Sequence, residues 1–239
     1  MRNTIEADEE MLYSDKEIHF DESLTIEGRA VFENCKIYCC ENGNGSSMEI
    51  EEDGELEFIN CEIIFCGVGA SKQKNYEFCF ISSDNGSMKI KDCKLYNLYH
   101  FAEGSYQELE VTNSEFTNCM AEIFDTDTDY DGTISECRFI SRNDNDDEEE
   151  ACTNKKAAVK KAAVKKAVVK KAAGKIMDPL IRGYFNISDC TFEFGANTDL
   201  YALELEDISS VSNCTFVNDE RVPAELLQDY TTCIHCKIV

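Results

Sequence analysis

Hydrophobic and polar residues alternate in short segments along most of the chain. In four segments two apolar residues stand two positions apart just before an Asn or Asp. These pairs are Leu56 and Phe58, Met88 and Ile90, Leu109 and Val111, and Phe185 and Ile187. A period of two places successive side chains on opposite faces of a strand. The pattern therefore predicts short β-strands with one buried face.

A tetrad of a polar residue, Cys, any residue and an apolar residue recurs along the chain. Copies begin at Asn34, Asn60, Asp92, Glu136, Asp189 and Asn213, and a seventh copy at Asn113 has Ser in the Cys position. The short intervals between copies are 21–26 residues, and those of 32 and 53 are explained by insertions. Repetition at this period indicates a solenoid. The polar residue suits a tight corner, because Asn and Asp tolerate left-handed backbone.

A second group of strands is expected at 76–81, 99–102, 121–124 and 201–205. Each coil would then contain about three short strands and one long, variable loop. Each strand would pair with the same strand of the next coil. Cys would lie over Cys and Phe over Phe inside the solenoid, and Asn over Asn at the bend.

The seven tetrads and the strands before them cover about residues 18–142 and 180–218, and they resemble the repeats of the pectin-lyase-like superfamily. The resemblance implies an all-β, right-handed parallel β-helix solenoid of about seven coils. We expect an N-terminal cap over 1–17 and coils over 18–142. An acidic run and a Lys/Ala-rich insertion, helical or disordered, would occupy 143–179. Further coils and a C-terminal cap, with a helical turn at 223–228, would occupy 180–239.

Six of the 14 Cys residues occur within the tetrads. Ser can replace Cys as a small buried residue but not as a disulfide partner, so the Ser copy favours packing over cross-linking. The first residues are acidic and resemble no signal peptide. We therefore expect reduced, core-facing thiols and a cytoplasmic location. A disulfide framework and metal binding are the alternatives.

Lys and Arg total 23 against 48 Asp and Glu, which gives a net charge of −25. Such a chain repels phosphate and is a poor general nucleic-acid binder. The exception is Lys155–Lys175, which holds nine Lys and no acidic residue. It reads either as a solvated low-complexity segment or as a basic arm that contacts nucleic acid or an acidic partner. No apolar run approaches the roughly 20 residues that span a bilayer, so no membrane span is expected.

An acidic segment before Gly132 resembles the first part of an EF-hand calcium loop. Its carboxylates are Asp125, Asp127, Asp129 and Asp131. The residue in the place of the closing bidentate acid is Arg138, and Ile134 leads into a strand instead of a helix. Two interpretations stay open, a weak calcium site and an acidic solvated turn. No other cofactor is expected.

Enzymes of the resembled superfamily that cut acidic polysaccharides use carboxylate clusters, often with calcium, and a basic residue. Asn-Thr-Asp at 197–199 matches one motif of the polygalacturonase branch, but its Asp pair, Gly-His-Gly and Arg-x-Lys motifs are absent. His19, His100 and His235 are isolated, so no catalytic triad is evident. A polyanionic substrate would also be repelled by the acidic chain.

Near the C-terminus, Cys233 and Cys236 form half of a zinc motif. Cys236 also begins the outline of a prenylation box. The third interpretation is an ordinary final strand.

Together these patterns predict a single-domain, monomeric, non-enzymatic binding or scaffold module whose protein or glycan partner is unknown. The alternative is a carbohydrate-active enzyme, either a polysaccharide lyase or a glycoside hydrolase.

Overall fold

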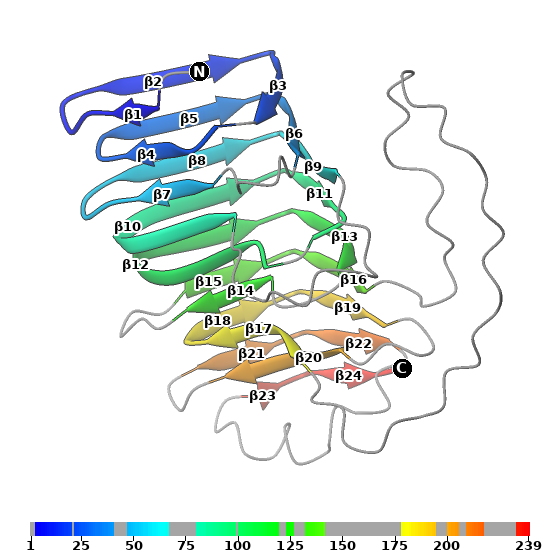
Figure 1. Cartoon of the computed structure of the whole chain (residues 1–239). Coiled ribbons are helices and arrows are strands. Elements are labelled where there is room, and N and C mark those ends of the chain that lie inside the picture. The colour runs from blue at the N-terminus through cyan, green and yellow to red at the C-terminus, as the bar shows by residue number, and fades with distance from the viewer. Residues whose placement is uncertain are drawn as a thin grey trace, which may run out of the picture.

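The computed structural model describes residues 3–20, 22–40, 47–66, 80–98, 100–119, 123–126, 132–141, 178–194, 200–205, 209–217 and 233–239. Within these ranges the chain is all-β and contains no helix. Its strands pair in parallel and form one sheet of fifteen strands and one of nine (Figure 1). The predicted all-β class with parallel pairing is confirmed, and the stacking is compatible with a parallel β-helix.

The strands fall into three stacks. The first stack runs β1 (Thr4–Ile5), β4 (Leu24–Ile26), β7 (Met48–Ile50), the beginnings of β10 (Ile81–Lys91) and β12 (Ala102–Thr112), then β14 (Phe124–Thr126), β17 (Asp178–Gly183) and β20 (Leu200–Leu205). The second stack runs β2 (Glu10–Ser14), β5 (Arg29–Glu33), β8 (Glu55–Ile59), the ends of β10 and β12, β15 (Gly132–Ser135), β18 (Phe185–Ser188), β21 (Ser210–Ser212) and β23 (Cys233–Ile234). The long strands β10 and β12 join these two stacks into the larger sheet.

The third stack is the nine-stranded sheet. It contains β3 (Glu17–Phe20), β6 (Lys36–Cys40), β9 (Glu62–Cys66), β11 (Lys94–Tyr96), β13 (Glu115–Cys119), β16 (Arg138–Ser141), β19 (Thr191–Glu193), β22 (Thr215–Val217) and β24 (Lys237–Ile238). The seven tetrads supply β6 to β22, and β3 and β24 lie beyond them. The segment expected as an N-terminal cap therefore contributes β1 and β2, which pair with β4 and β5 as a further coil. The predicted insertion at 143–179 and the turn at 223–228 lie, apart from the first residues of β17, outside the described residues.

The corner between the second and third stacks has left-handed backbone in every coil described. Its residues are Asp15, Asn34, Asn60, Asp92, Asn113, Glu136, Asp189, Asn213 and His235, with φ between 45° and 60°. The Asn60 side-chain amide donates a hydrogen bond to Asn34 Oδ1 at 2.7 Å, so these corner side chains are linked from one coil to the next. The predicted left-handed corner and its Asn-over-Asn stacking are confirmed.

The corner between the first and second stacks needs residues without a side chain. A Cβ on Gly54 would lie 2.2 Å from the carbonyl oxygen of Ile26 in the preceding coil. Gly183 has a φ of +115°, and its Cβ would lie 2.3 Å from the carbonyl oxygen of Thr126. Glycine therefore allows neighbouring coils to approach closely at this corner.

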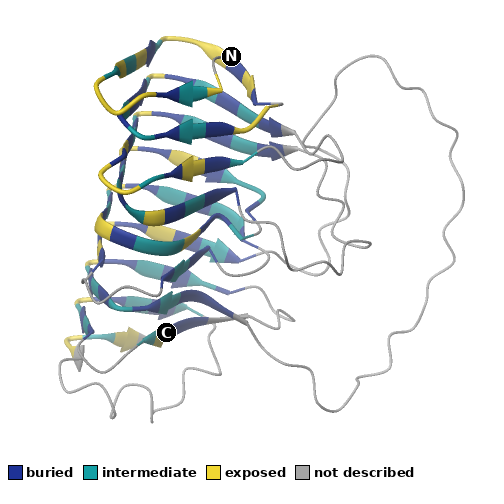
Figure 2. Cartoon of the chain, turned by 60° about the vertical axis from the view of Figure 1, so that its left-hand side comes forward, coloured by how far each residue is buried: buried dark blue, intermediate teal, exposed yellow. Residues whose placement is uncertain are grey.

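Aromatic side chains stack along the core. Phe116, Phe139, Phe192 and Phe216 form a continuous column with ring centroids 4.6, 5.0 and 5.2 Å apart and nearly parallel planes. Such pairs contribute about 0.5–1.5 kcal/mol each beyond burial of their area. Figure 2 shows buried and less buried residues alternating along the strands. The expected Phe-over-Phe packing is confirmed.

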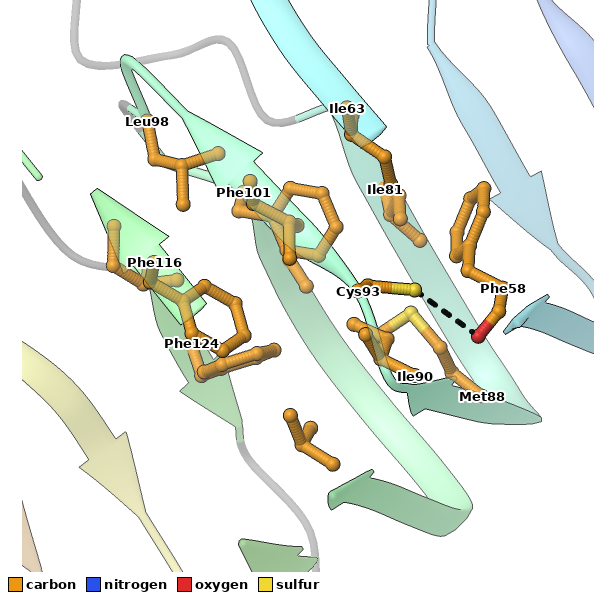
Figure 3. Close-up of a cluster of buried hydrophobic side chains, with 14 of the residues drawn as sticks. Phe58, Ile63, Ile81, Met88, Ile90, Cys93, Leu98, Phe101, Phe116 and Phe124 are labelled. Atoms are coloured by element: carbon orange, nitrogen blue, oxygen red, sulfur yellow. Dashed lines mark hydrogen bonds between the residues drawn. The ribbon is translucent and has the colours of Figure 1, made fainter. Parts of the chain in front are cut away.

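The Cys residues of the tetrads form a second buried column, here called the thiol column. The thiol of Cys93 donates to the carbonyl oxygen of Lys91 at 3.1 Å. It also lies 3.4 Å from the carbonyl oxygen of Phe58, in the preceding coil, to which it donates as well (Figure 3). Its sulfur accepts a hydrogen bond from the backbone N–H of Cys61 at 3.3 Å. None of the thiols with described side chains is in a disulfide bond. The tetrad thiols are therefore packed and core-facing, as expected, but they also hydrogen-bond the backbone at the corner.

Candidate functional site

An outward row of charged residues crosses the first stack. Glu103, Asp125, Arg182 and Glu204 are in register on β12, β14, β17 and β20. The inward residues on either side of Asp125 are Phe124 and Thr126, so strand alternation directs the carboxylate outward. Arg182 Nη1 lies 3.5 Å from Asp125 Oδ2, and Nη2 lies 3.3 Å from Glu204 Oε2. We call these four residues the first-stack row.

The first-stack row places Asp125 beside a cation. Exposed pairs of this kind contribute about 0–1 kcal/mol to stability. The guanidinium of Arg182 neutralises part of the negative charge that would attract calcium. Asp127, Asp129 and Asp131 lie outside the described residues, so the predicted calcium site stays a prediction. The part of the chain that is described contains no group of three His, Cys, Asp or Glu side chains placed to hold a metal ion.

Gly132 and Arg138, which define the EF-hand alignment, have structural roles in strands. Gly132 begins β15, and a Cβ there would lie 2.6 Å from the ring of Phe185. Arg138 lies on the third stack, where its hydrogen bond to Glu193 raises the pKa of its guanidinium. The segment after Gly132 is therefore a strand, as the sequence indicated, and not the second half of a calcium loop.

The third stack carries an outward column of alternating charge. Its residues in the first six coils are Glu17, Lys36, Glu62, Lys94, Glu115 and Arg138, and the uncharged Thr191 and Thr215 and then Lys237 follow them in register. Lys36 Nζ lies 3.3 Å from Glu62 Oε2, and Arg138 Nη1 lies 3.4 Å from Glu115 Oε2. Lys36 and Lys94 therefore each have an acidic residue in register in both neighbouring coils, and Arg138 has one in the coil before it. We call the six residues from Glu17 to Arg138 the charge column.

A less polar column lies two residues further along the same strands. It consists of His19, Tyr38, Ile64, Tyr96, Thr117 and Ile140. His19 is exposed and the other five are half-buried. The rings of His19 and Tyr38 stack with centroids 4.8 Å apart, and Lys36 Nζ lies 5.5 Å from the Tyr38 ring centroid. We call these six residues the outer stripe.

The charge column and the outer stripe together form what we call the third-stack face. Its charge column has three acidic and three basic residues, on a chain whose net charge is −25. The hydrogen bond to Tyr38, followed by the pairing with Glu62, raises the pKa of Lys36, so this lysine stays protonated. A face with balanced charge and half-buried aromatic rings is suited to binding, because aromatic residues are enriched at interface cores.

Both surfaces were missed by the sequence analysis. Each residue of the first-stack row comes directly after an inward, buried residue of its strand. This common position relative to the apolar residue is visible in the sequence. The 53-residue interval between two tetrads obscures it, because Asp125 and Arg182 pair across that interval. Five of the six charge-column residues are the third residue of a tetrad, so most of the column could have been found by reading that position down the repeat.

The C-terminal residues Cys233 and Cys236 belong to a further coil. Cys233–Ile234 is β23, His235 is the left-handed corner, and Lys237–Ile238 is β24. Cys236 Sγ lies 3.8 Å from the carbonyl oxygen of Ile234 and 3.9 Å from that of Val211, so it extends the thiol column. This geometry favours the ordinary final strand over the zinc and prenylation interpretations.

Two further sequence features, residues 197–199 and Lys155–Lys175, lie outside the described residues. Among the described residues no helix has the length and apolar character needed to cross a membrane. Comparison of the chain with protein-family models, curated proteins and solved structures gave no match.

Proposed function

We propose that this chain is a non-enzymatic binding or scaffold module of the right-handed, pectin-lyase-like parallel β-helix type, and that its third-stack face holds the partner. The observation that carries the proposal is the outer stripe beside the balanced charge column. Tyr38, Ile64 and Tyr96 occupy consecutive coils at the same outward position. They give a row of half-buried apolar side chains that strand pairing holds in place.

Rigidity supports this role. The strands that carry Tyr38, Ile64 and Tyr96 are paired in parallel on both sides, and the buried side chains of their inward residues lie behind them. A face that is already ordered loses little conformational entropy on binding. The spacing of neighbouring strands, about 4.8 Å, also gives the face a regular period that an extended partner surface can match.

The first-stack row is the feature that an enzymatic function would use. Glu103 and Asp125 occupy adjacent coils, so two carboxylates lie side by side with Arg182 next in line. A pair of carboxylates at a fixed separation is what glycoside hydrolysis requires. The ion pairs of Arg182 with Asp125 and Glu204 favour a surface charge ladder instead, because they occupy the groups that would act on substrate.

The two functions are separated by variants in the two surfaces. Tyr38→Ala/Tyr96→Ala alters the third-stack face, and Asp125→Asn/Arg182→Gln alters the first-stack row. Each protein is tested for cleavage of neutral and acidic polysaccharides and for the proteins and glycans it retains from a cell extract. Circular dichroism checks that both variants fold.

We expect no cleavage by any of the three proteins. Partners retained by the wild type should be lost from the tyrosine variant and kept by the first-stack variant. Polysaccharide cleavage that disappears with Asp125→Asn/Arg182→Gln would establish the enzyme instead. Retention that is equal for all three proteins would reject the third-stack face as the binding surface.

A further inference from the structure

The third-stack face has a charge pattern that is complementary to itself. We propose that it binds a second copy of this chain, face to face and with the two solenoid axes antiparallel. This inference rests on the proposed function, because it names the occupant of the same face. Three features support it: the order of charges in the charge column, the outer stripe beside it and the size of the face.

The charge column alternates in sign over six consecutive coils, beginning with an acid and ending with a base. A two-fold axis that runs along the strand direction between β9 and β11 reverses the order of coils and keeps the position along each strand. It places Glu17 opposite the partner's Arg138, Lys36 opposite the partner's Glu115, and Glu62 opposite the partner's Lys94. Every charge in the column then faces an opposite charge. An isologous interface needs this self-complementarity.

The alternation also excludes neighbouring registers. A shift of the partner by one coil places Glu opposite Glu and base opposite base along the whole column. Like charges held opposite each other at an interface disfavour the wrong arrangement. A parallel alignment of the two solenoids, with each coil facing its own copy, has the same defect. The charge column therefore favours the antiparallel register that pairs all six of its charges.

The outer stripe follows the same symmetry. The axis places Ile64 opposite the partner's Tyr96 and Tyr38 opposite the partner's Thr117, with these pairs near the centre of the contact. Half-buried rings and aliphatic side chains would lose their remaining contact with water there. Aromatic residues close to the centre of an interface commonly supply much of the binding energy.

The size of the face predicts a reversible dimer. Six coils at about 4.8 Å per coil extend over about 24 Å between the first and last strands. Such a patch is small beside the roughly 800 Å² per partner of a standard interface. Repulsion between two chains of charge −25 opposes association, but it is screened beyond a Debye length of about 8 Å at physiological salt. We therefore expect association that depends on concentration.

Sedimentation velocity of the full chain over a wide concentration range tests the proposal. The variants are Lys36→Glu, Glu115→Lys, their 1:1 mixture, and the matched control Lys89→Glu. Lys89 also pairs with an acid in the next coil, with Nζ 2.8 Å from Glu108 Oε2, but it lies on the second stack. Melting temperatures of all variants check that their folds are intact.

Each third-stack variant places like charges opposite each other twice in its own dimer, so we expect at least a tenfold rise in its dissociation constant. In the mixture, the acid introduced by Lys36→Glu in one chain meets the base introduced by Glu115→Lys in the other. The unchanged Glu115 of the first chain meets the unchanged Lys36 of the second, so dimerisation should return. Lys89→Glu should dimerise like the wild type.

A wild type that stays monomeric at all concentrations, a mixture that does not recover, or a control that is equally impaired would overturn the proposal. A monomeric wild type whose retained partners still depend on Tyr38 and Tyr96 would overturn self-association alone and leave the binding function standing. A monomeric wild type with no dependence on those tyrosines would overturn both.

Discussion

The hydroxyl oxygen of Ser114 accepts a hydrogen bond from the backbone N–H of Cys93 at 3.0 Å. The sulfur of Cys93 likewise accepts a hydrogen bond from the backbone N–H of Cys61, one coil earlier. Ser114 also donates to the carbonyl oxygen two residues before it, that of Thr112, at 2.8 Å. The position therefore requires a small side chain that both donates and accepts, and Ser and Cys both meet this requirement.

This requirement predicts different effects for two substitutions of similar size. Cys93→Ala removes a donor to Lys91 and Phe58 and an acceptor for Cys61, and leaves these buried backbone groups without that partner. We expect a loss of about 1–3 kcal/mol in the free energy of unfolding. Cys93→Ser should cost less, because Ser114 shows that a hydroxyl fits the column. Urea unfolding measures both, and an alanine variant as stable as the wild type would reject the hydrogen-bonding role.

Glu136 occupies a left-handed corner, with a φ of 56°, where most other coils have Asn or Asp. The left-handed conformation costs most residues about 1–2 kcal/mol, and this cost is smaller for Asn. Glu136→Asn should therefore raise the free energy of unfolding by about 0.5–1 kcal/mol. Asn213→Glu provides the reverse change at an equivalent corner and should lower it. Two shifts of the same sign in thermal or urea unfolding would contradict this account of the corner.

Burial of Cys119 predicts a loss of stability at alkaline pH. Its side chain is fully buried, and desolvation raises the pKa of its thiol from 9.0 to about 12. The unfolded chain therefore releases this proton at lower pH than the folded chain does. The contribution of Cys119 to stability is complete below pH 9 and is lost as the pH rises towards 12.

The measurement is the free energy of unfolding against pH for the wild type and for Cys119→Ser, which has no thiol to ionise. The difference between the two curves isolates Cys119 from the lysines and tyrosines that titrate in the same range. It should shrink as the pH rises above 9. A constant difference would mean that the thiol is accessible to solvent in the folded chain.

The calcium hypothesis makes a separate prediction. A cation bound at Asp125, Asp127, Asp129 and Asp131 would raise the melting temperature in millimolar calcium relative to a chelator. Asp127→Asn/Asp129→Asn should remove that rise. Arg182→Gln should increase it, since Asp125 then loses its neighbouring cation. An unchanged melting temperature at millimolar calcium would reject the site and weaken the lyase-type alternative.

Much of the fold could be predicted from the sequence because its strongest signals are local. Alternation of period two, the repeated tetrad and the Asn corners each arise within one coil, and each is found in the structure. Two coils were missed because their tetrads differ. The first has Lys16 in the Cys position, and the last has His235 at the corner.

The candidate surfaces were harder to predict because they depend on register between coils. Lys36, Glu62 and Lys94 are far apart in the sequence and become neighbours only when β6, β9 and β11 pair. Arg182 reaches Asp125 across the long interval that contains the Lys-rich segment. Outward residues also lack the apolar signature that marks the core, so alternation alone does not show which of them form a surface.

Radical footprinting of tyrosines tests whether the third-stack face binds a second copy of this chain. Tyr38 and Tyr96 are half-buried on that face, and Tyr184, also half-buried, lies at the turn between β17 and β18. As the concentration of the full chain rises, we predict that labelling of Tyr38 and Tyr96 falls while labelling of Tyr184 stays constant. Labelling that falls at Tyr184 alone, or at none of the three, would contradict self-association through this face.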